Sequence, residues 1–323
     1  MIKIKRTLQP FIKDDEIVFG FGNSSIERRI KNTEENIELI RQLDADYSLR
    51  ENFLLNREKL EEFRNLGLLT ENNYDNSKFS RNINFYEWID ITQNTDPRVH
   101  QEKLKGSTVL IVGLGGIGGT VAEILARLGV GKFILVDFDI VEESNLTRQS
   151  VFSNSDVGEY KNKIVKEYLE KISESEIVSV NCKINSKNEL EDIFKKYDFD
   201  IAICCADTPF VEIDYWFSDL SFQYNRPFIA GSYASTTINY AYINPKRTMS
   251  LREFYGGNMI TDDSILDKKA PSSIIAPISF MASGMIAYKV FSELTGLGNI
   301  KDVIQIDLLT WEVHNFEITK NIS

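Results

Sequence analysis

Residues 109–118 read Val-Leu-Ile-Val-Gly-Leu-Gly-Gly-Ile-Gly, an apolar run that passes directly into closely spaced glycines. The run predicts a buried strand, and the glycines predict a tight turn from which a helix begins. Without side chains, Gly113, Gly115, Gly116 and Gly118 let the backbone approach a phosphate, which the helix N-terminus also attracts. The stretch therefore predicts an adenine-nucleotide site, and a tight turn without a ligand is the alternative.

The sequence on both sides of this turn alternates expected strands and helices. Strands are expected at 108–112, 132–136 and 199–205, and helices at 117–128 and 161–172. This alternation predicts a parallel sheet covered by helices, an α/β fold of the Rossmann-like, doubly wound kind. Later elements are expected as strands at 236–243 and 303–309, a helix at 279–294 and a loop at 250–271 that closes over a site.

The residues after the second expected strand favour ATP over NAD. Asp137 lies 24 residues after Gly113, where a carboxylate suits a ribose hydroxyl in either kind of site. Cations then gather beyond it, as cleavage of a triphosphate requires, whereas a dehydrogenase has no need of them. An NAD-dependent oxidoreductase is therefore disfavoured. The sequence also lacks an evident histidine for a hydride-transfer site.

Four motifs in order resemble the nucleotide-binding core of the MoeB, ThiF and ubiquitin-activating superfamily of adenylating enzymes. They are Asp137-x-Asp139, Asn145-Leu-x-Arg148-Gln149, Val157-Gly-x-x-Lys161, and Asp207 after a strand. The resemblance covers residues 78–295 and implies ATP and Mg²⁺ as cofactors. It implies that Asp137 holds the ribose, that Asn145, Arg148 and Lys161 bind the triphosphate, and that Asp207 positions Mg²⁺ and the α-phosphate.

The resemblance also implies a homodimer with composite sites. The superfamily takes an arginine from the partner subunit, shortly before the Rossmann strand. Arg81 occupies that place, in a connector expected at 76–106 that precedes an adenylation domain at 107–323. Taken singly, Arg148 and Lys161 have a simpler reading as surface charges, and Asp207 as a helix N-cap.

Residues 1–75 predict a separate α+β module. Two short strands around an acidic turn at 11–20 precede helices at 33–43 and 56–66, and a polar wing follows at 70–78. This order predicts a winged helix and resembles the leader-peptide clamp of peptide-modifying enzymes, the branch represented by MccB and PaaA. A leader would add to an edge strand, lined by Ile17, Val18, Phe19, Ile37 and Ile40. A packing or dimerisation module is the alternative.

The cysteines bear on the fate of an acyl-adenylate. Many relatives hold zinc with two Cys-x-x-Cys pairs, whereas residues 244–249 near the first expected pair contain no cysteine, so no zinc site is expected. No cysteine follows Cys205, which disfavours a thioester or sulfur relay. We expect direct capture of the adenylate, as in cyclisation during peptide-antibiotic maturation. A noncatalytic recognition partner and MoeB/ThiF-like activation of a small carrier protein are the alternatives.

Composition sets the remaining limits. The 323 residues carry a net charge of −11, which disfavours nucleic acid as the main partner. No apolar run approaches a membrane span, and the first residues contain no apolar signal segment. The three cysteines, with two of them adjacent, do not suggest disulfides. These features predict a cytoplasmic protein that does not bind membranes.

Overall fold

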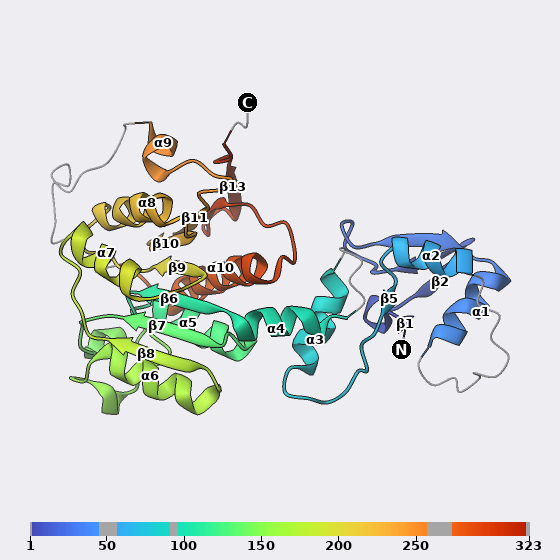
Figure 1. Cartoon of the computed structure of the whole chain (residues 1–323), viewed down its shortest axis with the longest axis horizontal. Helices are drawn as coiled ribbons and strands as arrows, with labels where there is room; N and C mark the ends of the chain where they lie inside the picture. The colour runs from blue at the N-terminus through green and yellow to red at the C-terminus, as the bar shows by residue number, and fades with distance from the viewer. Residues whose placement is uncertain (1, 45–56, 91–95, 257–272, 321–323) are drawn as a thin grey trace. The chain divides into compact units, whose positions relative to one another are not determined.

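The computed structural model describes residues 2–44, 57–90, 96–256 and 273–320. Its internal contacts divide the chain into two units (Figure 1). Unit 1 comprises Met1–Lys103 with Thr295–Gly298, and unit 2 comprises Leu104–Leu294 with Asn299–Ser323. Each unit has its own β-structure and its own core.

Unit 2 is built on an eight-stranded sheet with the order β13-β12-β11-β10-β9-β6-β7-β8. Strands β10, β9, β6, β7 and β8 run parallel, and β11, β12 and β13 extend the sheet in antiparallel fashion. The bounds of the strands are β6 Thr108–Val112, β7 Lys132–Val136, β8 Glu176–Val180, β9 Ile201–Cys204, β10 Phe228–Ala234, β11 Thr237–Ile243, β12 Val303–Asp307 and β13 Glu312–Phe316.

The strand order changes direction beside β6. The chain proceeds from β6 to β7 and β8 on one side, and then returns to β9 on the other side of β6. In open α/β sheets, ligands bind at such a switch point, outside the carboxyl ends of the strands. Val112 pairs in register with both Val136 and Cys204, so the three strands end at one level. The residues that follow these strands therefore share one edge of the sheet.

Helices cover the sheet of unit 2. They are α5 Gly118–Leu128, α6 Lys161–Ile172, α7 Lys187–Lys196, α8 Glu212–Tyr224, α9 Leu251–Tyr255 and α10 Ala276–Thr295, with short 3₁₀ turns η2 Glu143–Asn145 and η3 Asn154–Asp156. Leu110 and Val112 of β6 belong to a core cluster that also contains Phe194 of α7 and Phe217 of α8. Strands buried on both faces explain why the sequence of β6 is apolar without alternation.

Unit 1 contains a three-stranded sheet, β2-β3-β4, and a two-stranded ladder of β1 with β5. Its elements are β1 Lys3–Ile4, η1 Arg6–Leu8, β2 Phe11–Lys13, β3 Glu16–Phe19, β4 Arg28–Lys31, α1 Glu34–Leu43, α2 Arg57–Asn65, β5 Leu69–Thr70, α3 Ser80–Ile89 and α4 Arg98–Gly106. The Thr33 side chain accepts from the Asn36 N–H and so caps α1. Phe19 and Phe63 are fully buried in the core of this unit.

The predicted α/β, Rossmann-like fold is confirmed, and β6, β7 and α6 have the predicted bounds. The sequence reading missed several elements, among them β4, β8, α7, α8, β10 and β13. It also left the connector at 76–106 without elements, where the structure has α3 and α4. The expected loop at 250–271 begins with the short helix α9, and residues 257–272 lie outside the described residues. The winged-helix assignment stays a prediction.

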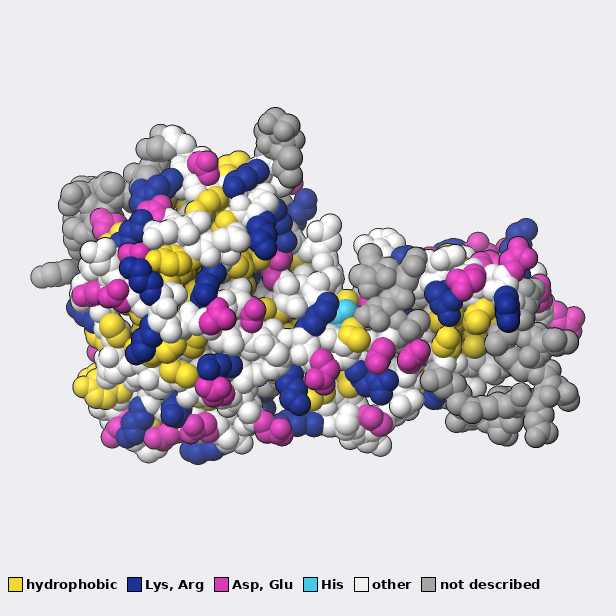
Figure 2. Space-filling model, in the orientation of Figure 1, with side chains coloured by type: hydrophobic (Ala, Val, Ile, Leu, Met, Phe, Trp, Pro, Cys, Tyr) yellow, Lys and Arg dark blue, Asp and Glu magenta, His cyan; other side chains and the backbone are white. Residues whose placement is uncertain are grey.

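Two surface properties bear on possible partners. In the described part of the chain, no helix is long and apolar enough to cross a membrane. On the face of the molecule shown in Figure 2, Lys and Arg side chains are interspersed with Asp and Glu, and no extended basic patch is visible there.

Candidate nucleotide site

The turn between β6 and α5 has two positions that only glycine can fill. Gly113 has φ +88°, and a Cβ there would lie 2.6 Å from the backbone carbonyl of Cys205. At Gly118 a Cβ would lie 1.9 Å from the Gly113 carbonyl oxygen. The Gly113 N–H donates to the Val136 carbonyl at 2.9 Å, which joins the turn to the end of β7. The turn is therefore fixed in place by both neighbouring strands.

The other two glycines differ in what surrounds them. A Cβ at Gly115 would meet Gln149 Nε2 at 3.8 Å and no other described atom within 4 Å, so this side of the turn is open. At Gly116 a Cβ would lie 2.7 Å from the Tyr233 hydroxyl and 2.9 Å from Ser279 Oγ. Ser279 also donates to the Gly116 carbonyl at 2.8 Å. One side of the turn is thus lined by hydroxyl groups from β10 and α10, and the other meets few atoms of the described residues, which leaves room for a phosphate.

Asp137, which directly follows β7, is hydrogen-bonded to the glycine turn. Its carboxylate accepts the Leu114 N–H at 2.6 Å and the Asp139 N–H at 2.7 Å. Burial raises the pKa of this carboxyl group, and the two backbone hydrogen bonds oppose that rise. Asp137 is only 7% exposed, so the structure shows it bracing the glycine turn. The ribose contact expected of Asp137 remains a prediction.

Lys161 and Asp139 form the charged part of the same edge. The Lys161 side chain is 9% exposed, and its Nζ lies 3.1 Å from Asp139 Oδ2. The Lys161 N–H donates to the Asp139 carbonyl at 2.9 Å, which ties the start of α6 to the segment after β7. The Asp139 side chain is 48% exposed and remains accessible. The structure thus brings together two residues that are 22 positions apart in the sequence.

The segment around η2 contains buried polar atoms that have no partner. The Arg148 Nη1 donates to the Ser144 carbonyl at 2.9 Å. Arg148 Nε and Gln149 Oε1, however, are buried without a hydrogen bond to any of the described residues. Buried polar groups in native proteins are nearly always paired, so an unpaired donor and acceptor on neighbouring residues indicate a place for a ligand. Gln149 borders the open side of Gly115.

Asn145 has a structural partner within the same segment. Its Oδ1 accepts the Glu142 N–H at 3.1 Å in a capping box with the Glu142 side chain. The residue is buried, and this bond fixes the η2 turn, which lies just before Arg148 and Gln149 in the chain. A contact of Asn145 with a triphosphate stays a prediction.

Asp207 lies three residues beyond the end of β9, on the edge that carries the glycine turn. It is exposed, and its Oδ1 accepts from the Thr208 hydroxyl at 3.3 Å. An exposed carboxylate at this edge fits the way Mg²⁺ binds, through one or two carboxylates together with substrate phosphates and waters. Within the described residues, no group of three or more His, Cys, Asp or Glu that could hold a metal ion is found.

The two adjacent cysteines, Cys204 and Cys205, lie next to the glycine turn. Cys204 is buried at the end of β9, and a Cβ at Gly118 would lie 3.3 Å from the Cys205 Cβ. Burial and the nearby Asp214 carboxyl raise the pKa of both thiols. Burial also raises the pKa of Asp214 to about 6, and a hydrogen bond with Cys204 opposes that rise. Thiols held protonated in this way are poor nucleophiles, in agreement with a packing role.

Several hydroxyl residues of the site were missed by sequence reasoning. Ser279 and Ser283 lie one turn apart on α10, and Ser283 donates to the Ile117 carbonyl at 3.3 Å. Thr120 donates to the Gly116 carbonyl at 3.3 Å. The spacing of the two serines in the part of α10 before Lys289, which is otherwise apolar, was the available signal. Tyr233 had no local signal, because strand pairing brings it to the turn.

In unit 1, Arg81 is exposed in the first turn of α3.

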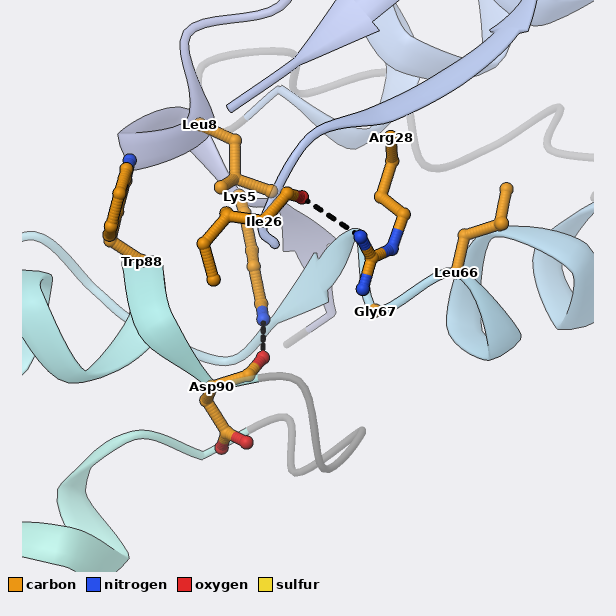
Figure 3. A pocket seen from close by; sticks show the side chains of 8 residues that line it. All are labelled: Lys5, Leu8, Ile26, Arg28, Leu66, Gly67, Trp88 and Asp90. Atoms are coloured by element: carbon orange, nitrogen blue, oxygen red, sulfur yellow. Dashed lines mark hydrogen bonds between the residues drawn. The ribbon is translucent and has the colours of Figure 1, made fainter. Parts of the chain in front are cut away.

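A small pocket of the same unit is shown in Figure 3. Lys5 donates to the Asp90 carbonyl at 3.0 Å there, and Leu8, Ile26, Arg28, Leu66, Gly67 and Trp88 complete the lining. Its volume of about 10 Å³ is sufficient for roughly one water molecule. The pocket therefore cannot hold a nucleotide base.

Three of the five side chains expected to line a leader groove are buried inside unit 1. Ile17, Val18 and Phe19 of β3 are buried, with exposed fractions of 3%, 0% and 0%. Ile17 and Phe19 belong to the core cluster of unit 1, and β3 is the central strand of its sheet. The expectation that these three side chains contact a leader is therefore wrong. Among the described strands, the edges of this sheet are β2 and β4.

An ion-pair cluster occupies the region where relatives were expected to carry the first zinc-binding pair. Arg247 donates from Nη2 to Glu293 at 2.7 Å and to Asp302 at 2.8 Å. Lys289, only 1% exposed, donates to the same two carboxylates at 2.7 and 2.8 Å and to the Ile300 carbonyl at 2.8 Å. Two cations thus face two carboxylates and join the end of β11 to α10 and β12.

Comparisons with known proteins agree with this architecture. A family model described as "ThiF family" matches residues 79–322. A curated relative, "Adenylyltransferase and sulfurtransferase UBA4" of Meyerozyma guilliermondii, is 30% identical over 201 residues, which are 61% of this chain and 45% of that protein. The chain thus matches less than half of that relative's length.

Two solved structures share the fold along nearly the whole chain. "Crystal structure of E. coli MccB + ATP" matches with a TM-score of 0.81 at 23% identity, covering 99% of this chain and 98% of that one. "Crystal Structure of SeMet PaaA" matches with a TM-score of 0.76 at 20% identity, covering 98% and 99%. The predicted resemblance to this superfamily is confirmed, and so is the predicted ThiF/MoeB type of fold.

Proposed function

Because the chain belongs to the ThiF family, we propose that it uses ATP to adenylate a carboxyl group. The observation that carries this proposal is a pair of buried atoms, Arg148 Nε and Gln149 Oε1, that have no partner among the described residues and lie beside the open side of Gly115. A triphosphate supplies oxygens for the arginine, and a phosphate on the glycine turn is favoured by the N-terminus of α5. Lys161 adds a second, point-like cation at the same edge.

The proposed reaction divides the residues by task. Arg148, Lys161 and Asn145 hold the triphosphate, and Asp137 with Asp139 borders the ribose. A carboxylate oxygen of the substrate forms a bond to the α-phosphorus while the bond to the β-phosphate oxygen breaks. Pyrophosphate leaves with the electron pair, so the cations stabilise charge that grows on the leaving group. When bound, Mg²⁺ would be held by Asp207 and would neutralise phosphate charge.

For the substrate we propose a ribosomally made precursor peptide. The structures of MccB and PaaA support this at the level of the fold, and one neighbour is described as MccB in complex with N-formylated MccA. In unit 1 the edge strand β2 is exposed along its length, with Ile12 57% exposed. An unpaired edge can accept a leader by β-augmentation. The acyl-adenylate would then be captured directly, for example by cyclisation during peptide-antibiotic maturation.

The remaining parts of the proposal concern assembly and compartment. A homodimer would let Arg81 of one subunit reach the site of the other, as the family resemblance implies. Cys182, Cys204 and Cys205 are free thiols, which is compatible with action in the cytoplasm.

The test is ATP consumption by the purified chain with and without synthetic precursor peptides encoded beside its gene. AMP and pyrophosphate released only with peptide are expected, and Asp207→Ala should abolish this release. ADP in place of AMP would overturn adenylation. Peptide binding without any nucleotide turnover would favour a noncatalytic recognition partner.

Activation of a small carrier protein is a second candidate, favoured by the similarity to the relative named adenylyltransferase and sulfurtransferase. It predicts AMP release with a carrier protein whose C-terminal carboxyl is free, and none with short peptides. Running both substrates in the same assay separates the two candidates.

A further inference from the structure

Tyr233 reaches the glycine turn through strand pairing. Strand β10 runs parallel to β9, with Ala230 in register with Cys204. Tyr233 and Asp207 each lie three residues beyond that pair. Both therefore lie past the carboxyl end of β9, although β10 itself continues to Ala234. Side chains alternate along a strand, so Tyr233 shares a face with Gly231. A Cβ at Gly231 would lie 2.1 Å from the Ile286 side chain, so this face is the one covered by α10.

The Tyr233 hydroxyl lies against the glycine turn, and no hydrogen bond to a described residue is found for it. It lies 2.7 Å from the position a Cβ would take at Gly116, directly before α5 begins. Ser279, the other hydroxyl at this glycine, donates to the Gly116 carbonyl. Among residues 2–44, 57–90, 96–256 and 273–320, no hydrogen-bond partner of the Tyr233 hydroxyl is found, and the residue is only half-buried. Its donor is therefore available to a ligand on the turn.

The charges around the turn indicate which part of a ligand this hydroxyl meets. Gln149 borders Gly115, and the cations Arg148 and Lys161 belong to the segments after β7, on one side of β6. Those cations suit the leaving pyrophosphate. Tyr233 comes from β10, which lies beyond β9 on the other side of β6. Asp207 follows β9 in the chain and so lies on that same side. A neutral donor suits the centre at which a carboxylate meets the α-phosphate.

We propose that Tyr233 is a catalytic residue whose hydroxyl donates a hydrogen bond to an oxygen of the reacting carboxyl–phosphoryl centre. This inference rests on the proposed adenylation. The phenol keeps its proton throughout, because forming the anhydride and releasing pyrophosphate requires no proton transfer. The hydrogen bond strengthens as charge develops on that oxygen, so the hydroxyl acts on the transition state more than on bound ATP.

The test is Tyr233→Phe, which removes the hydroxyl and keeps the ring that packs on the turn. Pyrophosphate exchange into ATP with a precursor peptide gives kcat and KM. We expect kcat to fall about 10²-fold, as for loss of one donor to a developing oxyanion, with KM for ATP unchanged within about twofold. Tyr224→Phe is the matched control, since it removes a hydroxyl bonded to Glu191 at the end of α8. It should leave both constants unchanged.

The outcomes separate this inference from the proposed function. A wild-type chain that exchanges pyrophosphate while Tyr233→Phe keeps its full kcat overturns the role of Tyr233 alone. A variant that raises KM for ATP and leaves kcat unchanged overturns it as well, because the hydroxyl would then serve ground-state binding. A wild-type chain with no exchange on any peptide or carrier protein overturns both the adenylation and this inference.

Discussion

Two groups of buried polar side chains in unit 2 differ in how completely they are paired. In the cluster of Arg247, Lys289, Glu293 and Asp302, every cation faces carboxylates within 2.8 Å. Beside the glycine turn, Arg148 Nε and Gln149 Oε1 are buried without partners among the described residues. The first group is fully paired, and the second leaves a donor and an acceptor open to a ligand.

This difference separates stability from function. A buried ion pair that loses one partner leaves an uncompensated charge, so the cluster should be sensitive to substitution. An unpaired buried group already carries its desolvation cost, so its removal should scarcely affect folding. Substitutions in the cluster should therefore change the free energy of unfolding, whereas substitutions at the open site should change turnover. The turn glycines are the exception, because they build the site and the fold together.

The largest effect is expected for Gly113→Ala. The new Cβ would meet the Cys205 backbone at 2.6 Å in a left-handed conformation. Overpacking and backbone strain together should lower the free energy of unfolding by roughly 4 kcal/mol. Urea denaturation measures this loss. Gly158→Ala is the control, since Gly158 has φ +92° but open space around it, and should lose about 1–2 kcal/mol from strain alone. Equal losses in the two variants would contradict the packing argument.

Arg148→Met should have the next largest effect, on catalysis alone. Loss of the guanidinium should reduce the rate of pyrophosphate exchange about 10²–10³-fold, equivalent to about 3–4 kcal/mol in the transition state. The free energy of unfolding should fall by about 1 kcal/mol or less, because the substitution removes the Nε that has no described partner and one exposed hydrogen bond, from Nη1 to the Ser144 carbonyl. A strongly destabilised variant with normal exchange would show that Arg148 belongs with the structural group.

Glu293→Gln should lower stability by about 2 kcal/mol at neutral pH, less than for a fully buried pair because Asp302 still faces both cations. Burial opposes ionisation of Glu293, but hydrogen bonds from Arg247 and Lys289 outweigh it and lower its pKa below the ordinary 4.5. A lowered pKa gives stability that is present above the ordinary value and is lost as pH falls further.

Urea denaturation of the Glu293→Gln variant and wild type across that range measures the effect. The difference between them should shrink as the pH is lowered below 4.5. Glu317→Gln removes the partner of Lys301 in a pair whose side chains are 57% and 78% exposed. That control should change stability by less than about 0.5 kcal/mol. A difference between Glu293→Gln and wild type that is independent of pH would show that charge is not the cause.

The smallest effect is expected for Lys163→Ala, two residues from Lys161 in α6. Lys163 pairs with Glu159 at 2.7 Å, but both side chains are about half exposed. Such an exposed pair contributes about 0.5 kcal/mol or less, and exchange should be unchanged. Lys161→Ala, in contrast, should reduce exchange strongly. Similar exchange rates for the two variants would remove Lys161 from the proposed site.

The sequence predicted those features whose signals are local. An apolar run followed by the glycines of 113–118 requires a strand, a turn and a helix, and β6 and α5 follow that reading. Helix α8 was missed because Glu212–Tyr224 buries residues on several sides and shows weak helical periodicity. Strand β8 was missed because it is a partly buried edge strand and so lacks the apolar run that marks β6 and β7.

The part of the site that depends on tertiary pairing could not be predicted. The role of Asp137 in bracing the turn depends on hydrogen bonds to Leu114 and Asp139 that only the folded chain reveals. Tyr233 reaches Gly116 because β10 pairs with β9, and no spacing in the sequence indicates this. Within the ion-pair cluster, the spacing of Lys289 and Glu293 on one helix was readable, but the approach of Arg247 and Asp302 was not.

The central claim is that a substrate carboxyl oxygen becomes bonded to the α-phosphorus of ATP. The most direct test uses a precursor peptide whose carboxyl groups carry ¹⁸O, with mass spectrometry of the nucleotide product. Adenylation followed by attack at the acyl carbon predicts AMP that retains one ¹⁸O from the peptide. Unlabelled AMP, which would require water to attack the phosphorus, or ADP as the product, would contradict the account.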